Sequence, residues 1–178
     1  MPLPHIPAVS LSAETELVAQ LNAFRVAEDQ ETLVFANGPT QASRRHAADM
    51  AFNGVRDFTG SDGSNPGQRM RDTCYEWVTV GQIIGWGFAD PGEMAQFWIN
   101  SPVHRDLLLD SRYDDLGPGY AYNEESDWQH YWSVTLAQPS GPRIRSAAAG
   151  AGYSCSVETR SARGGSRLTW NQESPCPT

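Results

Sequence analysis

The pattern of hydrophobic and polar residues near the start of the chain predicts two helices. Leu17, Leu21 and Phe24 recur at helical spacing, and Ser12 precedes them as a suitable N-cap. A second helix is expected to follow the Asn-Gly-Pro-Thr stretch and to end at Gly54, because glycine readily adopts the left-handed conformation common after helix ends. The apolar stripe of this helix consists of Ala42, His46, Ala47, Met50 and Ala51.

The middle of the chain predicts one strand followed by two short helices. Residues 77–88, WVTVGQIIGWGF, are rich in β-branched and aromatic residues and are expected to form the strand. Asp90 and Pro91 then supply the N-cap and first position of a helix, and Ser101 and Pro102 repeat that signal. The first helix is expected to bury Met94, Phe97 and Trp98, and the second carries His104.

The later part of the chain predicts mainly strands. Residues 117–123 and 127–138 alternate between apolar and polar positions and are expected to form an antiparallel pair joined through residues 124–126. Two further strand-like pieces, YSCSVE and SRLTW, lie near the C-terminus. The order of helices, strand, helices and strands favours an α+β sandwich over alternating βαβ units.

Length and composition limit the chain to one main domain. The chain has 178 residues, of which 39% are hydrophobic, and this suffices for one core but leaves little room for a second. We expect a flexible N-terminal arm over residues 1–9, the domain over residues 10–139 and a C-terminal extension over residues 140–178.

The three cysteines, Cys74, Cys155 and Cys176, show no C-x-x-C spacing and so give no metal or redox signature. The latter two lie in the C-terminal extension, where a disulfide closing a loop of ~20 residues contributes about 2–4 kcal/mol. A disulfide implies an oxidising compartment. Cys74 is then expected to be a buried thiol.

The net charge of −8 and the isoelectric point near 4.9 argue against nucleic-acid binding and against docking on an anionic membrane. All 13 basic residues are arginine, so chemistry that requires a lysine is excluded. The chain has no run of 18 apolar residues, and hence no membrane span is expected. Its first residues lack the features of a signal peptide, which is either absent or already removed.

The polar stretch DFTGSDGSNPGQRMR, residues 57–71, has the composition of a ligand-binding loop. The calcium loop of an EF-hand requires glycine at its sixth position, which is Asp62 here, and a nucleophile elbow requires serine where Asn65 stands. The stretch also lacks the glycine pattern and the lysine of a phosphate-binding loop. A tight turn accounts for it, with positive φ at Gly60 and Gly63, an Asx-turn at Asp62 and a helix starting at Pro66.

The four histidines form no metal-spaced pair. His46 lies within an apolar stripe and is expected to be a core residue, His5 lies on the N-terminal arm, and His130 is expected on the surface or opposite a neighbouring strand. His104 differs, because the first turn of a helix disfavours imidazolium and leaves a neutral ring that either binds a ligand or caps its own turn.

Several stretches together resemble a known family. They are NAFRVAEDQETLVFANGPTQASRRHAADMA, FTGSDGSNPGQRMRDTCY, VGQIIGWG, MAQFWINSPVHRDLLLDSRYDDLGPGYAY and YWSVTLAQP. In this order, from about residue 13 to residue 139, they resemble the bacterial SCP-domain branch of the CAP superfamily of cysteine-rich secretory, antigen and pathogenesis-related proteins. The resemblance implies an α-β-α sandwich with a small antiparallel sheet between helices, and a secreted, extracellular or periplasmic protein whose signal peptide was removed.

The same resemblance implies a site at which family members hold a divalent metal with histidines and acidic residues. The histidine before the Thr-Gly-Ser-Asp-Gly block is replaced by Phe58, and the acidic residue of Gly-Glu-Asn-Ile is replaced by Gln82. Of the family's site residues, only His104 is clearly retained. One neutral imidazole cannot hold zinc, so we expect a degenerate site with no metal and no cofactor.

We therefore favour a secreted binding module with a polar, metal-free cleft edged by aromatic residues, for a small apolar molecule or another extracellular macromolecule. The expected cleft residues are Phe58, Asp62, Gln82, Ser101, His104 and Tyr131, and Ile83 and Trp86 contribute apolar walls. Two alternatives remain: a hydrolase with His104 as base and Ser101 as nucleophile, and a structural, envelope-associated protein without a ligand.

Overall fold

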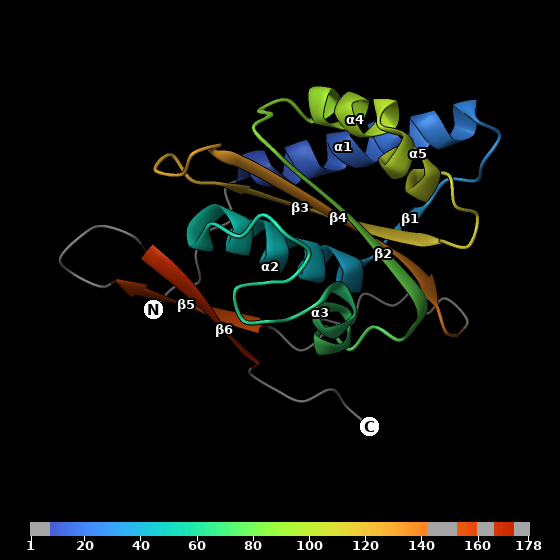
Figure 1. Cartoon of the computed structure of the whole chain (residues 1–178). Coiled ribbons are helices and arrows are strands. Elements are labelled where there is room, and N and C mark those ends of the chain that lie inside the picture. Colours follow the sequence, from blue (N-terminus) through green and yellow to red (C-terminus); the bar gives the residue numbers. More distant parts are fainter. Residues whose placement is uncertain (1–7, 142–152, 160–165, 173–178) are drawn as a thin grey trace.

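A four-stranded sheet separates two layers of helices (Figure 1). The computed structural model describes residues 8–141, 153–159 and 166–172, and the side chains of residues 11–141. The strand order is β1, β3, β4, β2; β1 runs parallel to β3, and the other neighbours are antiparallel. The strands are β1 (Val34–Phe35), β2 (Trp77–Trp86), β3 (Asp115–Tyr122) and β4 (His130–Pro139).

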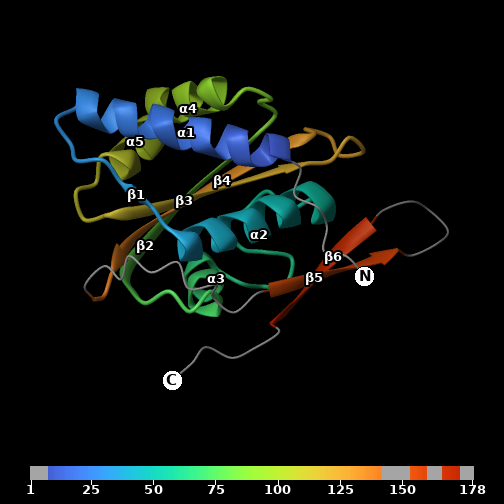
Figure 2. The same ribbon diagram turned by 180° about the vertical axis from the view of Figure 1, so that it is seen from behind.

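Three helices cover one face of the sheet and two cover the other (Figures 1 and 2). The first group is α1 (Ala8–Ala27), α4 (Pro91–Asn100) and α5 (Pro102–Leu108). The second group is α2 (Asn37–Asn53) and α3 (Pro66–Asp72). This arrangement confirms the α+β class and the α-β-α sandwich. Among the described helices, none combines the length and apolar character needed to cross a bilayer.

The two strand-like pieces near the C-terminus form a hairpin of β5 (Tyr153–Thr159) and β6 (Ser166–Gln172), as the sequence predicts. Strand β6 lies beside α2, on the side away from the main sheet (Figure 1). The C-terminal extension therefore adds a layer next to the helix that carries His46.

Local capping signals define most helix ends. The Asp90 carboxylate accepts a hydrogen bond from the Glu93 amide at 2.9 Å at the start of α4. Asn65 and Gln68 form a reciprocal capping box at the start of α3. Gly54, with φ +70°, ends α2 in the left-handed conformation.

Three local expectations are wrong. Helix α1 begins at Ala8, upstream of the proposed cap Ser12, and so includes residues 8 and 9, which were expected to belong to the N-terminal arm. Residues 1–7 lie outside the described part. Helix α2 begins at Asn37 and therefore includes the Asn-Gly-Pro-Thr stretch that was expected to precede it. Phe97 is 49% exposed, because the buried face of α4 centres on Met94 and Trp98 and leaves Phe97 at its margin, against the ring of Phe88 at 5.2 Å.

The larger core lies between the sheet and the layer of α1, α4 and α5. Two fully buried indoles anchor it, and both N–H groups are satisfied: Trp98 donates to the Ile84 carbonyl at 3.1 Å and Trp132 to the Phe88 carbonyl at 2.8 Å. The leucines and isoleucine of this core are Leu17, Leu21, Leu33, Ile83, Ile99, Leu108, Leu116 and Leu136.

On the opposite face, α2 lies directly on the backbone of β3. A Cβ atom at Gly117 would stand 1.9 Å from the Thr40 nitrogen, and one at Gly119 would stand 2.2 Å from the Ser43 carbonyl carbon. The Ser43 hydroxyl donates to the Gly117 carbonyl at 2.7 Å. The two glycines thus allow the backbones of α2 and β3 to approach more closely than any larger residue would permit.

A buried ion pair connects the two helical layers beside β3. The Glu14 carboxylate on α1 is fully buried and pairs with the guanidinium of Arg44 on α2. The same carboxylate accepts a hydrogen bond from the Tyr120 amide of β3 at 3.1 Å. Since β1 pairs with β3 only as far as Leu116, Glu14 satisfies an edge amide that no described strand covers.

Cys74 is disulfide-bonded, and the expectation of a free thiol is therefore wrong. The side chains of Cys155 and Cys176 lie outside the described part. With three cysteines in the chain, a bridge within the chain that includes Cys74 and a bridge between Cys155 and Cys176 exclude each other. We therefore no longer propose the Cys155–Cys176 pairing, which rested only on the position of both residues in the C-terminal extension.

Replacement of Gly117 by alanine is expected to destabilise the fold by about 3 kcal/mol or more, because the new methyl group meets helix backbone that cannot move independently. Gly141→Ala is the matched control, since a Cβ atom there has no neighbour within 4 Å, and a change within about 0.5 kcal/mol is expected. Urea unfolding measures both. Equal stability of the two variants would contradict the close approach of α2 to β3.

Candidate functional site

The structure distributes the predicted site residues over both faces of the sheet. Gln82 faces α3, where its side chain contacts Arg69, whereas the next residue, Ile83, faces the larger core. Ser101 and His104 belong to the layer of α4 and α5 on that second face. Because successive side chains of a strand point to opposite faces, the sheet separates Gln82 from His104. The six predicted residues therefore do not line one cleft.

The buried guanidinium of Arg69 occupies the centre of the α2 and α3 side. Its Nη2 donates to the Phe58 carbonyl at 2.7 Å and to the Gln82 Oε1 at 2.9 Å. Its Nη1 donates to the Ser64 carbonyl at 2.7 Å. Gln82 in turn donates to the Ser133 hydroxyl at 2.9 Å on β4. Arg69 is 1% exposed, so it acts as an internal cation that fastens the polar loop to the sheet.

Arg69 remains charged despite its burial. Desolvation, assisted by the positive charge of Arg45, lowers the pKa of Arg69 from 12.5 to about 10, while Asp62, Asp49 and Asp72 oppose this effect. Since a pKa of about 10 lies well above neutral pH, the guanidinium is a cation under ordinary conditions. Its Nε is buried and has no hydrogen-bond partner within the described residues.

The loop of residues 57–65 is held by side chains from two helices. On α2, the Asp49 carboxylate accepts hydrogen bonds from the Ser61 amide at 2.7 Å and from the Ser61 hydroxyl. Arg45 bridges Asp62 of the loop at 2.6 Å and Asp72 of α3 at 2.7 Å. The loop is therefore attached to α2 and α3 at several points and is not a free turn.

Asp62 forms the expected Asx-turn, with its carboxylate accepting from the Ser64 amide at 2.9 Å. Partial burial opposes its ionisation, but hydrogen bonds from Ser64 and Arg45 outweigh burial and lower the pKa of Asp62 to about 2. Gly63 has the expected positive φ of +80°, whereas Gly60 does not. Glycine is needed at position 60 for another reason, since a Cβ atom would lie 2.8 Å from the Asp62 carboxylate.

His46 is a fully buried core histidine, as expected. Its Nε2 lies 2.9 Å from the Asp57 carbonyl, which accepts only, so the neutral ring carries its proton on Nε2. Its Nδ1 is buried without a partner among the described residues. Burial first, and then the positive charge of Arg69, lower the pKa of His46 from 6.5 to about 4. The ring is therefore neutral at physiological pH.

Phe58 and Tyr131 have different environments on this face. Tyr131 is 3% exposed and packs against Ala47, Met50 and Ala51, so it belongs to the core. The ring of Phe58 is 44% exposed, although its backbone carbonyl is held by Arg69. Phe58 is thus an aromatic side chain at the surface of a well-anchored loop.

The geometry gives no support for a Ser101–His104 pair. Ser101 is the N-cap residue of α5 and its hydroxyl makes no capping hydrogen bond, and the described residues show no hydrogen bond between it and His104. The His104 ring lies 6.3 Å from the ring of Phe97, and its Nδ1 is buried without a described partner. Burial lowers the pKa of His104, so the imidazole is neutral. No described carboxylate orients it.

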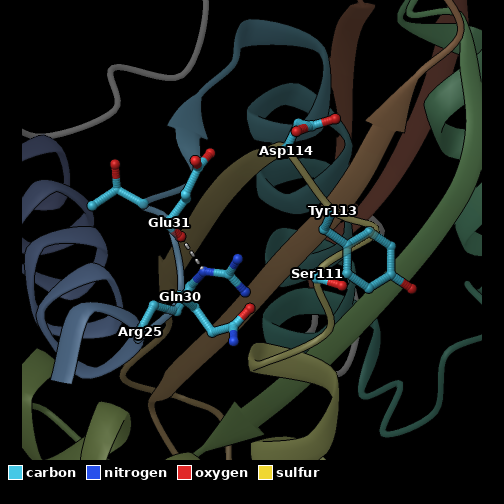
Figure 3. A pocket seen from close by; sticks show the side chains of 7 residues that line it. Arg25, Gln30, Glu31, Ser111, Tyr113 and Asp114 are labelled. Carbon is cyan, nitrogen blue, oxygen red and sulfur yellow. Dashed lines mark hydrogen bonds between the residues drawn. The ribbon is translucent and has the colours of Figure 1, made fainter. Parts of the chain in front are cut away.

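A polar pocket missed by the sequence analysis lies at the end of α1 (Figure 3). Its volume is about 120 Å³. The buried guanidinium of Arg25 forms part of its wall, although in the sequence Arg25 resembles any basic residue of a last helical turn. The remaining lining residues are Gln30, Glu31, Thr32, Ser111, Tyr113 and Asp114. Only the tertiary fold brings residues 30–32 next to residues 111–114.

Comparison with known proteins decides the family. Residues 18–136, more than half of the chain, match the model of CAP, the cysteine-rich secretory protein family. The chain belongs to the CAP family. This confirms the resemblance found in the sequence.

Two Bacillus subtilis proteins are similar to this CAP domain in sequence. The uncharacterized protein YkwD is 27% identical over 112 residues, which cover 62% of this chain and 44% of YkwD. The uncharacterized membrane protein YlbC is 22% identical over 111 residues, which cover 62% of this chain and 32% of YlbC. The chain therefore matches less than half the length of either relative.

Two solved structures have the same fold. An outer surface protein from Borrelia burgdorferi superimposes with a TM-score of 0.65 at 17% identity, covering 72% of this chain and 93% of that chain. An extracellular protein containing an SCP domain from Bacillus anthracis superimposes with a TM-score of 0.67 at 18% identity, covering 78% of this chain and 45% of that chain. At these identities the likeness concerns the fold alone.

The residues of this CAP domain do not fit the divalent metal that the family resemblance implies. The family resemblance implies a histidine at position 58 and an acidic residue at position 82. Here the Phe58 backbone carbonyl and the Gln82 side chain both accept hydrogen bonds from the Arg69 guanidinium. A positive charge at this point repels a metal cation. Within the described residues, no group of three or more His, Cys, Asp or Glu side chains is arranged as a metal site.

Acidification is expected to destabilise this CAP domain through His46. Because the pKa is about 4 in the folded state and 6.5 ordinarily, the unfolded state binds more protons between these values. Stability is then lost as the pH falls from 6.5 towards 4. A pKa difference of this size between the folded and unfolded states corresponds to about 3 kcal/mol of stability. Denaturant unfolding at pH 7.0 and pH 4.5 measures this loss, which should be smaller in His46→Gln. Burial also lowers the pKa of His130, but less strongly, so the comparison variant His130→Gln should keep most of the wild-type loss. Identical pH profiles in all three proteins would contradict the assignment.

Replacement of Gln82 by glutamate is not expected to create a metal site. The new carboxylate should pair with Arg69, so calorimetric titration with Zn²⁺ or Mg²⁺ at neutral pH should show no stoichiometric binding. Gln82→Leu removes the acceptor and should cost about 1–3 kcal/mol of stability by leaving an Arg69 donor unsatisfied. One bound metal ion per chain, in the wild type or in Gln82→Glu, would show that Arg69 does not block the site.

Proposed function

We propose that this CAP domain is an extracellular interaction module whose recognition surface is the loop of residues 57–65. The observation that carries the proposal is the exposed ring of Phe58 on a loop whose backbone is fixed from α2 and α3. Aromatic side chains that insert into a pocket of the partner are common anchors of protein interfaces.

Preorganisation of the loop supports this proposal. Binding usually costs free energy because loops and side chains become ordered. Here Asp49, Arg45 and Arg69 already hold the loop, so little further ordering is required. Burying the exposed 44% of Phe58 in a partner would then contribute about 0.7–1.3 kcal/mol.

The shape of this surface favours a macromolecular partner over a small apolar molecule. A small apolar ligand needs a concave apolar site that encloses most of its surface. The Arg25 pocket is polar, and Phe58 is not among the residues that line it. The interior beside the loop is filled by Arg69 and its hydrogen-bond partners. An exposed ring on a fixed loop instead suits insertion into a partner.

An extracellular location is supported by two independent observations. Cys74 is disulfide-bonded, and structural disulfides persist mainly in oxidising compartments. The similar Bacillus anthracis protein is described as extracellular, and the similar Borrelia burgdorferi protein as an outer surface protein.

The hydrolase alternative has less support, because Ser101 and His104 show neither the mutual hydrogen bond nor the orienting third group of a catalytic site. The experiment below distinguishes the proposed function from a structural, envelope-associated role without a ligand.

Immobilised protein should retain partners from the secreted and cell-surface fractions of the source organism, quantified by mass spectrometry. Binding of the partners retained by the wild type should be weakened in Phe58→Ala by about threefold to tenfold, which is the fold-change that corresponds to about 0.7–1.3 kcal/mol. The matched control is Phe97→Ala, which removes an equally exposed ring on the other side of the sheet. Retention that is identical in all three proteins would refute the Phe58 surface.

Two further measurements distinguish the alternatives. A fluorescent fatty acid that binds the wild type but not Phe58→Ala would indicate a small apolar ligand instead of a macromolecule. Hydrolysis of a generic ester that is lost in His104→Ala would indicate the hydrolase. No specific retention and no activity would leave the structural role.

A further inference from the structure

The Arg25 pocket contains a buried cation with unused hydrogen-bond donors. Arg25 is 2% exposed, at the C-terminal end of α1. Its Nε donates to the Glu31 carbonyl at 2.8 Å and its Nη1 donates to the Leu108 carbonyl. A guanidinium carries five N–H groups. The remaining N–H groups of Arg25 have no acceptor within the described residues, and the side chain lines the pocket.

The electrostatics of Arg25 favour an anionic ligand group. Burial lowers the pKa of Arg25, and the carboxylates of Asp110 and Asp114 partly oppose this effect. A negatively charged acceptor in the pocket would form charge-assisted hydrogen bonds with the N–H groups of Arg25 that have no described acceptor. A carboxylate matches the planar geometry of the guanidinium best, because two parallel hydrogen bonds form at once.

The opposite side of the pocket is acidic. Figure 3 shows the carboxylates of Glu31 and Asp114 directed away from the guanidinium, which lies nearer Ser111. Phosphate or sulfate, with two negative charges, would be repelled by these groups. A ligand that carries a carboxylate and an ammonium group complements both sides of the pocket.

The volume limits the ligand to a small molecule. The pocket measures about 120 Å³, and one water molecule in the liquid takes up about 30 Å³. A ligand of about five or six non-hydrogen atoms therefore fits, whereas a nucleotide, a sugar chain or a lipid does not.

We infer that the Arg25 pocket is a binding site for a small zwitterion of the α-amino acid class. Its carboxylate accepts hydrogen bonds from the free Arg25 N–H groups, and its ammonium group faces Glu31 and Asp114. Ser111 and Tyr113 also line the pocket. This site is separate from the Phe58 surface and does not depend on it.

The experiment uses glycine and L-alanine as probes, with sodium acetate and methylammonium chloride as matched half-ligands. Amide chemical shifts of the full chain are followed by NMR at constant ionic strength, with attention to residues 30–32 and 111–114. We expect saturable shifts with glycine and L-alanine, and binding of acetate and of methylammonium that is weaker by about tenfold or more, because each lacks one of the two charges.

Three variants test the location. Arg25→Gln should abolish saturable binding. Since this change also removes two structural hydrogen bonds, Ser111→Trp serves as a second variant that fills the pocket and leaves Arg25 in place. Ser140→Trp, at an exposed serine outside the pocket lining, should bind glycine as the wild type does.

The inference is overturned by any of three results. The first is the absence of saturable shifts with glycine. The second is unchanged glycine binding in Ser111→Trp, which would place the site elsewhere. The third is equal binding of glycine and acetate, or of glycine and methylammonium, which would indicate a general ionic effect. None of these results bears on partner binding by Phe58.

Discussion

The close approach of α2 to β3 is the constraint on which the rest of the structure depends. With no side chain at Gly117 or Gly119, the helix backbone rests on the strand, and the Ser43 hydroxyl bonds directly to the Gly117 carbonyl. This contact sets the distance between α2 and the sheet, and it thereby fixes the positions of Arg45, His46 and Asp49. All three then reach the loop of residues 57–65. A helix held further out would lose these contacts together.

Arginine supplies the polar framework of a chain that contains no lysine. Arg69 bonds the loop to the sheet, and Arg44 joins α1 and α2 through Glu14 beside the edge of β3. The planar guanidinium can bond several acceptors at once, which suits burial better than a point charge does. Next to residues 58 and 82 this framework places the Arg69 guanidinium, a fixed internal cation. The region is therefore suited to support a surface loop and not to bind a metal.

The sheet also separates the polar features of the protein. Gln82 and Tyr131 face α2 and α3, whereas His104 lies with α4 and α5 on the other face. The Arg25 pocket lies beyond the end of α1 and belongs to neither group. If both proposals hold, a macromolecule and a small molecule would bind at separate places on this CAP domain without competition.

The sequence by itself determined the fold class, the helix start at Pro66, the helix cap at Asp90, the turn at Asp62 and the core position of His46, because each depends on residue type and local spacing. The tertiary structure alone decided which residues meet. Strand alternation placed Gln82 and His104 on opposite faces, although a family motif suggested one cleft. The bond from Arg69 to Gln82, the bridged state of Cys74 and the pocket around Arg25 depend on contacts between residues distant in the chain. Local spacing carries no record of such contacts.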